Sequence, residues 1–112
     1  MKIRSCLAAF LGMLALTPML LAARSAKDNY KEHCTSCHGS DGKSQTRLGK
    51  KSGAKDLSDK VALAKLSDED VFKTIKFGRK NDKGEEKMEP FGDELSDPEI
   101  TELVAYVRTL AK

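Results

Sequence analysis

The fold of this chain is decided by one short stretch, Cys34-Thr35-Ser36-Cys37-His38. On a helix, two cysteines three residues apart lie on one face, about one turn from each other. Two neighbouring vinyl groups on the edge of a porphyrin need thiols at about that separation. The histidine that follows can fold beneath the ring and offer an imidazole nitrogen to an iron. The C-x-x-C-H pattern therefore predicts covalent attachment of a c-type haem.

Three other chemistries use the same residue types. A thioredoxin-like redox pair is expected inside a βαβ pattern, and no strand run surrounds these cysteines. A plain disulfide is the second alternative, since such bonds form in exported proteins. Zinc is the third, with four nominal ligands in His33, Cys34, Cys37 and His38. Adjacent residues rarely reach one tetrahedral ion together, and no second pair of ligands follows, so haem is favoured.

The first 25 residues have the pattern of a secretory signal. Lys2 and Arg4 precede an uncharged apolar run over residues 6–23, and a small-residue cleavage site follows at about residues 23–25. The mature protein is then a single domain over residues 26–112. A bacterial periplasmic location is expected, because haem is joined to thiols on the far side of the inner membrane. The alternative that the run stays uncleaved as an inner-membrane anchor remains open.

Loss of the leader changes the charge of the protein. It removes three of the 20 basic residues and none of the 17 acidic ones. The mature chain then has 17 basic and 17 acidic groups and a net charge of zero. The charges are unevenly distributed along the chain. Residues 43–65 carry seven basic and two acidic groups, whereas residues 89–112 carry two basic and six acidic groups. Such a dipolar molecule can be steered by the field of a partner. The alternative is that these charged segments only form solvated surfaces and meet no partner.

A first helix is expected over residues 25–36, capped by Ser25 with Asp28 in the place of a capping-box acid. Its stripe at i, i+4 and i+7 should face haem and core, and consists of Tyr30, Cys34 and Cys37. His33 lies off this stripe. It is too close to Cys34 to reach the opposite face of the ring, so we expect it at the surface.

A loop is expected over residues 39–54, which hold four glycines and no clear period. One backbone carbonyl in this loop should accept the other imidazole N–H of His38, and we look for it near Arg47 and Leu48. Arg47 or a nearby lysine is also a candidate partner for a haem propionate. The alternative is that these cations only solubilise the loop.

The rest of the chain predicts further helices. Residues 56–66 are ambiguous, with apolar side chains that could line a pocket: Leu57, Val61, Leu63 and Leu66. Ser67 begins a helix with acids in its first turn, and Gly78 ends it. A polar turn over residues 79–87 follows. Ser96 opens the last helix with a capping box, and its apolar stripe comprises Ile100, Leu103, Val104, Val107 and Leu110.

Met88 is the second important residue. It is the only methionine outside the leader, and it lies between Lys87 and Glu89 in a polar loop, an unusual place for core packing. A soft thioether that binds haem iron opposite a histidine explains this position better. Pro90 would stiffen the ligand loop, and Phe91 would close the haem edge against water.

The chain resembles the class I c-type cytochromes, above all the small monohaem bacterial members. The likeness covers residues 26–112 and includes the attachment motif, the stretch CHGSDGKS and the final segment LSDPEITELVAYVRTL. It implies an all-α fold of about three to five helices wrapped around one covalently attached haem c. It also implies thioethers at Cys34 and Cys37, His38 as proximal iron ligand and Met88 as distal ligand.

The resemblance further implies that Tyr30 packs with Leu103 and Tyr106 where the first and last helices cross. The chain departs from many members at two places. Glu89 separates Met88 from the following proline, and no proline lies between His38 and Met88.

Together these features predict a soluble one-electron carrier and not an enzyme, because an iron with two axial ligands has no vacant position. Its partners would be redox proteins such as a cytochrome reductase, an oxidase or another reductase, which it meets through a small, wet contact. Lysines near the exposed edge would favour an acidic partner: Lys31, Lys80, Lys83 and Lys87. No nucleic acid and no small-molecule substrate is expected. The alternatives are a ligand-binding or peroxidase-like protein and an electron-relay subunit held in a membrane complex.

Overall fold

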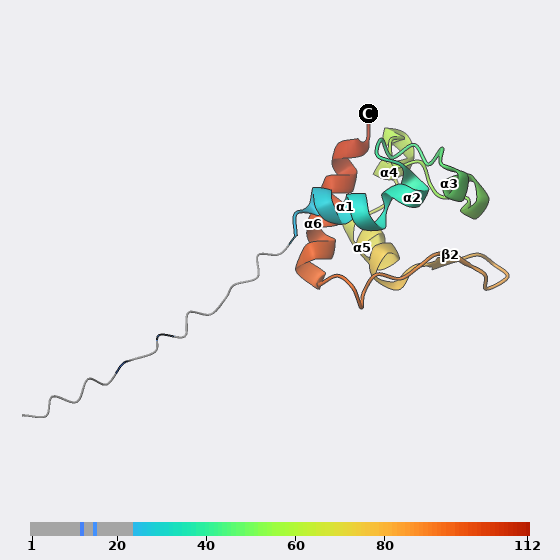
Figure 1. The fold of residues 1–112 in the computed structure, drawn as a ribbon. Helices are drawn as coiled ribbons and strands as arrows, with labels where there is room; N and C mark the ends of the chain where they lie inside the picture. Colours follow the sequence, from blue (N-terminus) through green and yellow to red (C-terminus); the bar gives the residue numbers. More distant parts are fainter. Residues whose placement is uncertain (1–11, 13–14, 16–23) are drawn as a thin grey trace, which may run out of the picture.

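The computed structural model describes Gly12, Ala15 and residues 24–112 (Figure 1). The predicted leader over residues 1–25 lies almost entirely outside this part, so the boundary at residue 26 stays a prediction. Six helices and one antiparallel hairpin occur among the described residues, in the order α1 (Ala26–His33), α2 (Thr35–His38), α3 (Arg47–Ser52), α4 (Lys60–Ala64), α5 (Asp68–Phe77), β1 (Arg79–Lys80), β2 (Glu86–Met88) and α6 (Asp97–Leu110).

The predicted all-α fold class is confirmed. The number of helices exceeds the expected three to five because the chain forms very short helices, such as α2 with four residues and α4 with five. None of the helices in the described part is both long and apolar enough to span a membrane.

The predicted N-terminal caps of α1 and α6 are present. The Ser25 side chain accepts the backbone N–H of Asp28 and so begins α1. The Ser96 hydroxyl accepts the N–H of Glu99, and the Glu99 carboxylate accepts the N–H of Ser96 in return. This reciprocal pair satisfies two backbone donors that the first turn of α6 leaves free.

The first helix is shorter than predicted, because α1 ends at His33 and α2 begins separately at Thr35. Cys34 stands between them with φ −115°. The Thr35 hydroxyl donates to the Lys31 carbonyl at 2.6 Å. In a continuous helix that carbonyl would accept a backbone N–H, so the threonine side chain competes with the helix at the break.

The predicted loop over residues 39–54 contains a helix that the sequence analysis missed. Thr46 caps α3, and Gly53 ends it in the left-handed conformation with φ +67°. Gly49 lies inside the helix, where glycine normally weakens it. A Cβ at Gly49 would collide with the backbone oxygen of Cys37 and lie 2.7 Å from that of Ser44. Close packing of α3 on α2 therefore explains this glycine.

The ambiguous segment 56–66 forms α4, capped by the Asp59 side chain. Leu63 is buried, whereas Val61 is 71% exposed and turns away from the interior. The next helix agrees with prediction, with a capping box between Ser67 and Asp70 and Gly78 as its C-cap. The predicted polar turn that follows is a hairpin in which β1 pairs with β2, and Arg79 stands opposite Met88.

The core lies where α1 crosses α6 and α5 packs alongside (Figure 1). Tyr30, Ile100 and Leu103 are almost completely buried there. The ring of Tyr30 lies 5.1 Å from that of Tyr106, which confirms the predicted contact between the first and last helices. This crossing forms one wall of the molecule's main cavity.

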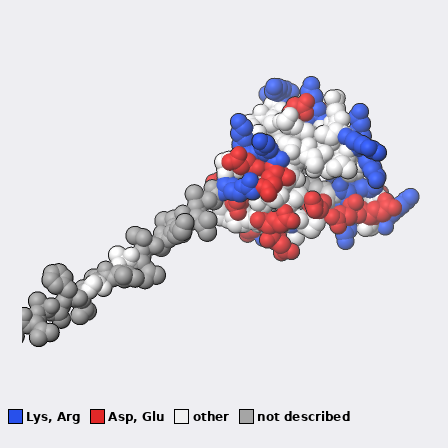
Figure 2. Space-filling model, viewed as in Figure 1, with Lys and Arg blue, Asp and Glu red and all other residues white. Residues whose placement is uncertain are grey.

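Charge is unevenly spread over the visible face of the folded part. Figure 2 shows basic side chains along the upper and right-hand edges and acidic side chains gathered along the lower edge. The upper right-hand region corresponds to α3 and its neighbours in Figure 1. This arrangement follows the charge asymmetry of the sequence.

Candidate functional site

The main cavity has a volume of about 400 Å³ and is lined by segments from most of the folded chain. All four predicted site residues line it: Cys34, Cys37, His38 and Met88. Met88 follows His38 by 50 residues and reaches the cavity from the end of the hairpin. The fold thus brings together in one place the residues that the sequence analysis singled out.

Most of the cavity wall is apolar. Its aliphatic and aromatic side chains come from α1, α4, α5, α6 and the segments between helices: Tyr30, Leu57, Leu63, Leu66, Val71, Ile75, Phe91, Leu103 and Val107. Three of the four leucines and valines predicted between residues 56 and 66 belong to this wall, and only Val61 does not. A wall of this kind excludes water and suits a large apolar ring.

The two cysteines are half-buried and are not bonded to each other. Burial, and to a smaller extent the neighbouring Cys37, raises the pKa of the Cys34 thiol to about 12. This thiol is therefore protonated at neutral pH, unlike the thiolate of a redox or catalytic cysteine. Within the part of the chain that the structure describes, no three His, Cys, Asp or Glu side chains are grouped to hold a metal ion. The geometry thus favours neither zinc nor a thioredoxin-like site.

His38 is held through one ring nitrogen. Its Nδ1 lies 3.0 Å from the backbone oxygen of Lys55 and 3.2 Å from Oγ of Ser44. Both partners can accept, so Nδ1 carries the proton and Nε2 keeps a free lone pair. Burial lowers the pKa of His38, the bond to Lys55 acts in the opposite direction, and the nearby Arg79 lowers the pKa further. The neutral imidazole is the form that binds a metal.

The prediction that a carbonyl near Arg47 or Leu48 would hold His38 is wrong. Residues 47–52 wind into α3, and the carbonyl that accepts from His38 belongs to Lys55, which follows this helix. Arg47 is exposed and does not line the cavity, and its pairing with a propionate stays a prediction. The cations at the cavity are Lys55, Arg79 and Lys87.

A scaffold of small residues fixes the attachment helix, and the sequence analysis missed it. The Thr46 hydroxyl lies 2.8 Å from the Ser36 carbonyl oxygen and 2.9 Å from that of Cys37, and it also accepts the N–H of Gly49. These contacts hold α3 against α2. A threonine before a short basic segment gives only a helix-cap signal, and the glycine-rich composition conceals it.

The segment that carries Met88 is attached to the end of α5. The N–H of Phe91 donates to the Ile75 carbonyl, and the N–H of Gly92 donates to that of Lys76, each at 3.0 Å. Phe91 is buried against the cavity, in agreement with its predicted role as a closing residue. Met88 itself is half-buried at the end of β2. The methionine is therefore presented from a braced loop.

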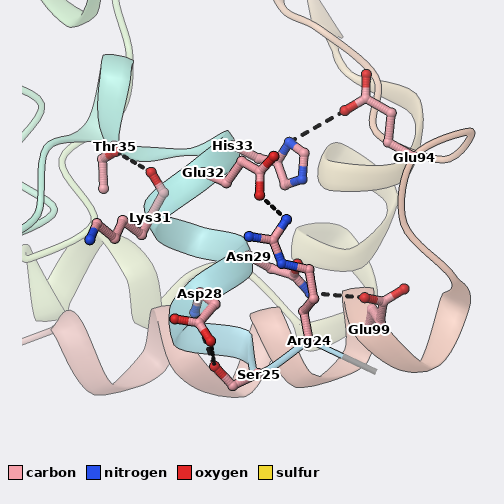
Figure 3. A network of polar contacts seen from close by, with 10 residues as sticks. All are labelled: Arg24, Ser25, Asp28, Asn29, Lys31, Glu32, His33, Thr35, Glu94 and Glu99. Atoms are coloured by element: carbon pink, nitrogen blue, oxygen red, sulfur yellow. Dashed lines mark hydrogen bonds and ion pairs between the residues drawn. The ribbon is translucent and has the colours of Figure 1, made fainter. Parts of the chain in front are cut away.

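His33 is not the surface residue that was predicted. Its side chain is only 17% exposed and lines the cavity, with Nδ1 3.3 Å from the Glu94 carboxylate. Its ring meets that of Phe91 edge-on, with centroids 5.5 Å apart. Figure 3 shows Glu94 reaching toward His33 from the loop before α6. The methionine loop thus folds back over the end of α1 and covers the histidine.

The residues at the cavity fit a c-type haem. Two thiols lie within one turn of each other, a neutral imidazole keeps Nε2 free, and a thioether arrives from a separate segment. These are the donors that attach a haem and bind its iron on two sides. The apolar wall matches the ring, and the cations Lys55 and Arg79 at the cavity match its carboxylates.

Comparison with known proteins gives a consistent result. Residues 21–107 match the family model described as "Cytochrome C oxidase, cbb3-type, subunit III". Among solved structures, the "KustC0563 c-type cytochrome" is similar, with 36% sequence identity and a TM-score of 0.71 over 80% of this chain and 100% of that chain. A tyrosine-to-phenylalanine mutant of Kustc0563 gives 34% identity and a TM-score of 0.68 over 78% and 99%. No curated protein matches the chain.

Proposed function

The chain belongs to the c-type cytochromes of the cbb3 oxidase subunit III family, and on that premise we propose that it is a monohaem electron carrier of a periplasmic respiratory chain. Membership implies a covalently bound haem c with its iron, and electron transfer as the activity. The observation that carries the finer proposal is the single cavity lined by both cysteines, the histidine and the methionine.

Each of the four residues has one role in this proposal. Cys34 and Cys37 would hold the ring through thioethers, His38 would offer Nε2 to the iron, and Met88 would bind on the other side. The haem supplies a metal centre that accepts and releases one electron. A thioether ligand and an apolar wall both favour the reduced state and so raise the reduction potential. With two protein ligands in place, no position is left for a substrate, so we do not expect an enzyme.

Tests of ligand binding separate this proposal from a ligand-binding or peroxidase-like protein. The reduced protein should not bind carbon monoxide readily if Met88 occupies the iron. Rapid binding by the wild-type protein would favour the rival. The absorption spectra of the oxidised and reduced protein report the thioether links and the methionine–iron bond in the same experiment.

The name of the family supports a second candidate function, an electron-relay subunit of a membrane oxidase. In that case the leader over residues 1–25 would remain as an anchor. N-terminal sequencing of the exported protein decides between the two. A new N-terminus near residue 25 supports the free carrier, and an N-terminus at Met1 supports the anchored subunit.

The partners are proposed to be a reductase and an oxidase that dock briefly over the cavity rim. Of the four lysines expected there, Lys87 lines the cavity and lies 3.7 Å from Glu85, so part of its charge is balanced within the hairpin. The excess of basic groups in residues 43–65 and of acidic groups in residues 89–112 supports steering by the field of a charged partner. The association rate should then fall with added salt, and a flat response would contradict steering.

A further inference from the structure

Ser44 is a buried polar residue between α2 and α3 with an unusual backbone. It is 7% exposed, and its φ is +58°. Among the described residues it is the only one other than glycine with positive φ. A side-chain-bearing residue in this conformation costs energy and persists only where the surroundings require it. Its contacts show what that requirement is.

All three polar contacts of Ser44 converge on His38 and its carbonyl partner. The backbone N–H donates to the His38 carbonyl at 2.8 Å. The hydroxyl donates to the Lys55 carbonyl oxygen, the same oxygen that accepts from His38. Ser44 Oγ also lies 3.2 Å from Nδ1 of His38. The left-handed turn therefore folds the chain back beneath the imidazole.

The number of protons fixes the direction of each bond. A serine hydroxyl has one proton and two lone pairs. With its proton on the Lys55 carbonyl, Ser44 Oγ can only accept from Nδ1 of His38. The single Nδ1–H of His38 is thus shared between two acceptors, the Lys55 carbonyl and the Ser44 hydroxyl.

We propose that Ser44 is a positioning residue for electron transfer, which acts through His38 by providing the second acceptor of its Nδ1–H. This inference rests on the proposed function, because it takes His38 as the iron ligand. Hydrogen bonds to the outer nitrogen of a ligating histidine fix its tautomer and orientation and make it a stronger donor. A stronger donor favours the oxidised iron. Ser44 thereby lowers the reduction potential.

A purely structural role for Ser44 predicts a different outcome. If the residue only braced the loop between α2 and α3, its replacement would affect stability through the backbone and leave the iron unchanged. Two substitutions separate these roles. Ser44→Ala removes the hydroxyl and keeps the strained φ, whereas Ser44→Gly removes the hydroxyl and relaxes the strain. Ser40→Ala, at an exposed serine, is the matched control.

The reduction potential of the haem-loaded protein is the decisive readout. Both Ser44 variants should shift the equilibrium between oxidised and reduced haem toward the reduced form by the same factor, at least threefold. A threefold shift raises the reduction potential by about 28 mV, because a tenfold shift corresponds to 59 mV for one electron. The Nδ1–H of His38 should also exchange faster with solvent in the NMR spectrum of both reduced variants. Ser40→Ala should change neither quantity.

Two results would overturn the proposal. The potentials of both Ser44 variants could equal that of the wild type, or the glycine variant could equal the wild type while only the alanine variant shifts. A spectrum without histidine–methionine ligation would instead contradict the proposed function itself. If neither variant folds, the wild-type protein still provides the test. Its reduced form must show a short proton–proton contact between His38 Nδ1–H and Ser44, and absence of that contact rejects the proposal.

Discussion

The hydroxyl of Tyr30 donates to the backbone oxygen of Gly39 at 2.6 Å, which ties the first helix to the residue directly after the attachment motif. Tyr30 is almost completely buried, and its ring also packs against that of Tyr106 of α6 in a tilted arrangement. One side chain therefore connects the helix crossing to the end of α2. This link explains how core packing determines the position of the cysteines and His38.

Tyr30→Phe should destabilise the protein by about 1–2 kcal/mol, because it keeps the ring contact and leaves a partly buried carbonyl without its donor. Urea unfolding of the haem-loaded protein measures this loss. Tyr106→Phe is the control, since within the described part of the chain the Tyr106 hydroxyl makes no hydrogen bond. Equal losses in the two variants would show that the Gly39 contact contributes nothing.

Gly49→Ala should prevent close packing of α3 on α2. The added methyl group would collide with the Cys37 carbonyl oxygen, and overpacking of this kind costs about 1–3 kcal/mol. The yield of haem-loaded protein should fall in parallel. Gly53→Ala is the matched control: its Cβ would meet no atom within 4 Å, so only the positive φ opposes it, at about 1 kcal/mol. A larger loss at Gly53 than at Gly49 would contradict this packing argument.

Glu99 should make stability depend on pH. Hydrogen bonds from the Ser96 backbone, the Asn29 amide and the Ser96 hydroxyl lower the pKa of its carboxyl group. Figure 3 shows Asn29 of α1 reaching Glu99 at the start of α6. The distance from Asn29 Nδ2 to Glu99 Oε2 is 3.0 Å. The ionised form is thus favoured in the folded protein. Its stabilising effect is complete above the unfolded pKa of about 4.3 and is lost as pH falls through the lower folded value.

Thermal unfolding of the wild type and of Glu99→Gln at several pH values tests this linkage. The wild type should be more stable near pH 6, and the difference should shrink as the pH is lowered below about 4. Glu102→Gln, at an exposed residue of the same helix, should follow the wild type. A difference that does not change with pH would rule out the ionisation of Glu99 as its origin.

Met88→Ala should fold and open the iron. Loss of a half-buried methionine costs about 2 kcal/mol or less, and the braced loop remains attached through Phe91. The reduced variant should bind carbon monoxide rapidly, and its reduction potential should fall, because the thioether favours the reduced iron. Met88→Leu, which keeps the volume without the sulfur, should behave like the alanine variant. If the variants bound carbon monoxide at the same rate as the wild type, the assignment of Met88 as an iron ligand would be wrong.

The long capped helices could be predicted from the sequence, because their signals are local. Ser67 begins its helix as predicted, and Ser96 with Glu99 forms the predicted capping box. The site residues could also be named, because the motif and the isolated Met88 carry strong chemical signals. The structure then shows them at one cavity.

Features that depend on tertiary contact could not be predicted. The helix α3 contains Gly49, which local propensity disfavours and close packing on Cys37 requires. The carbonyl partner of His38 is Lys55, 17 residues along the chain, and no local pattern marks a backbone oxygen. His33 is covered by a loop more than 50 residues away, so its position on α1 alone did not reveal its burial.

The central claim, that one haem is attached to Cys34 and Cys37 and bound through His38 and Met88, is tested most directly by absorption spectroscopy of the exported protein before and after extraction with acidic organic solvent. We predict one haem iron per chain, colour that stays with the polypeptide after extraction, and a ferric methionine–iron band that is present in the wild type and lost in Met88→Ala. A colourless protein, a ring that is released into the solvent, or a band that persists in Met88→Ala would contradict the account.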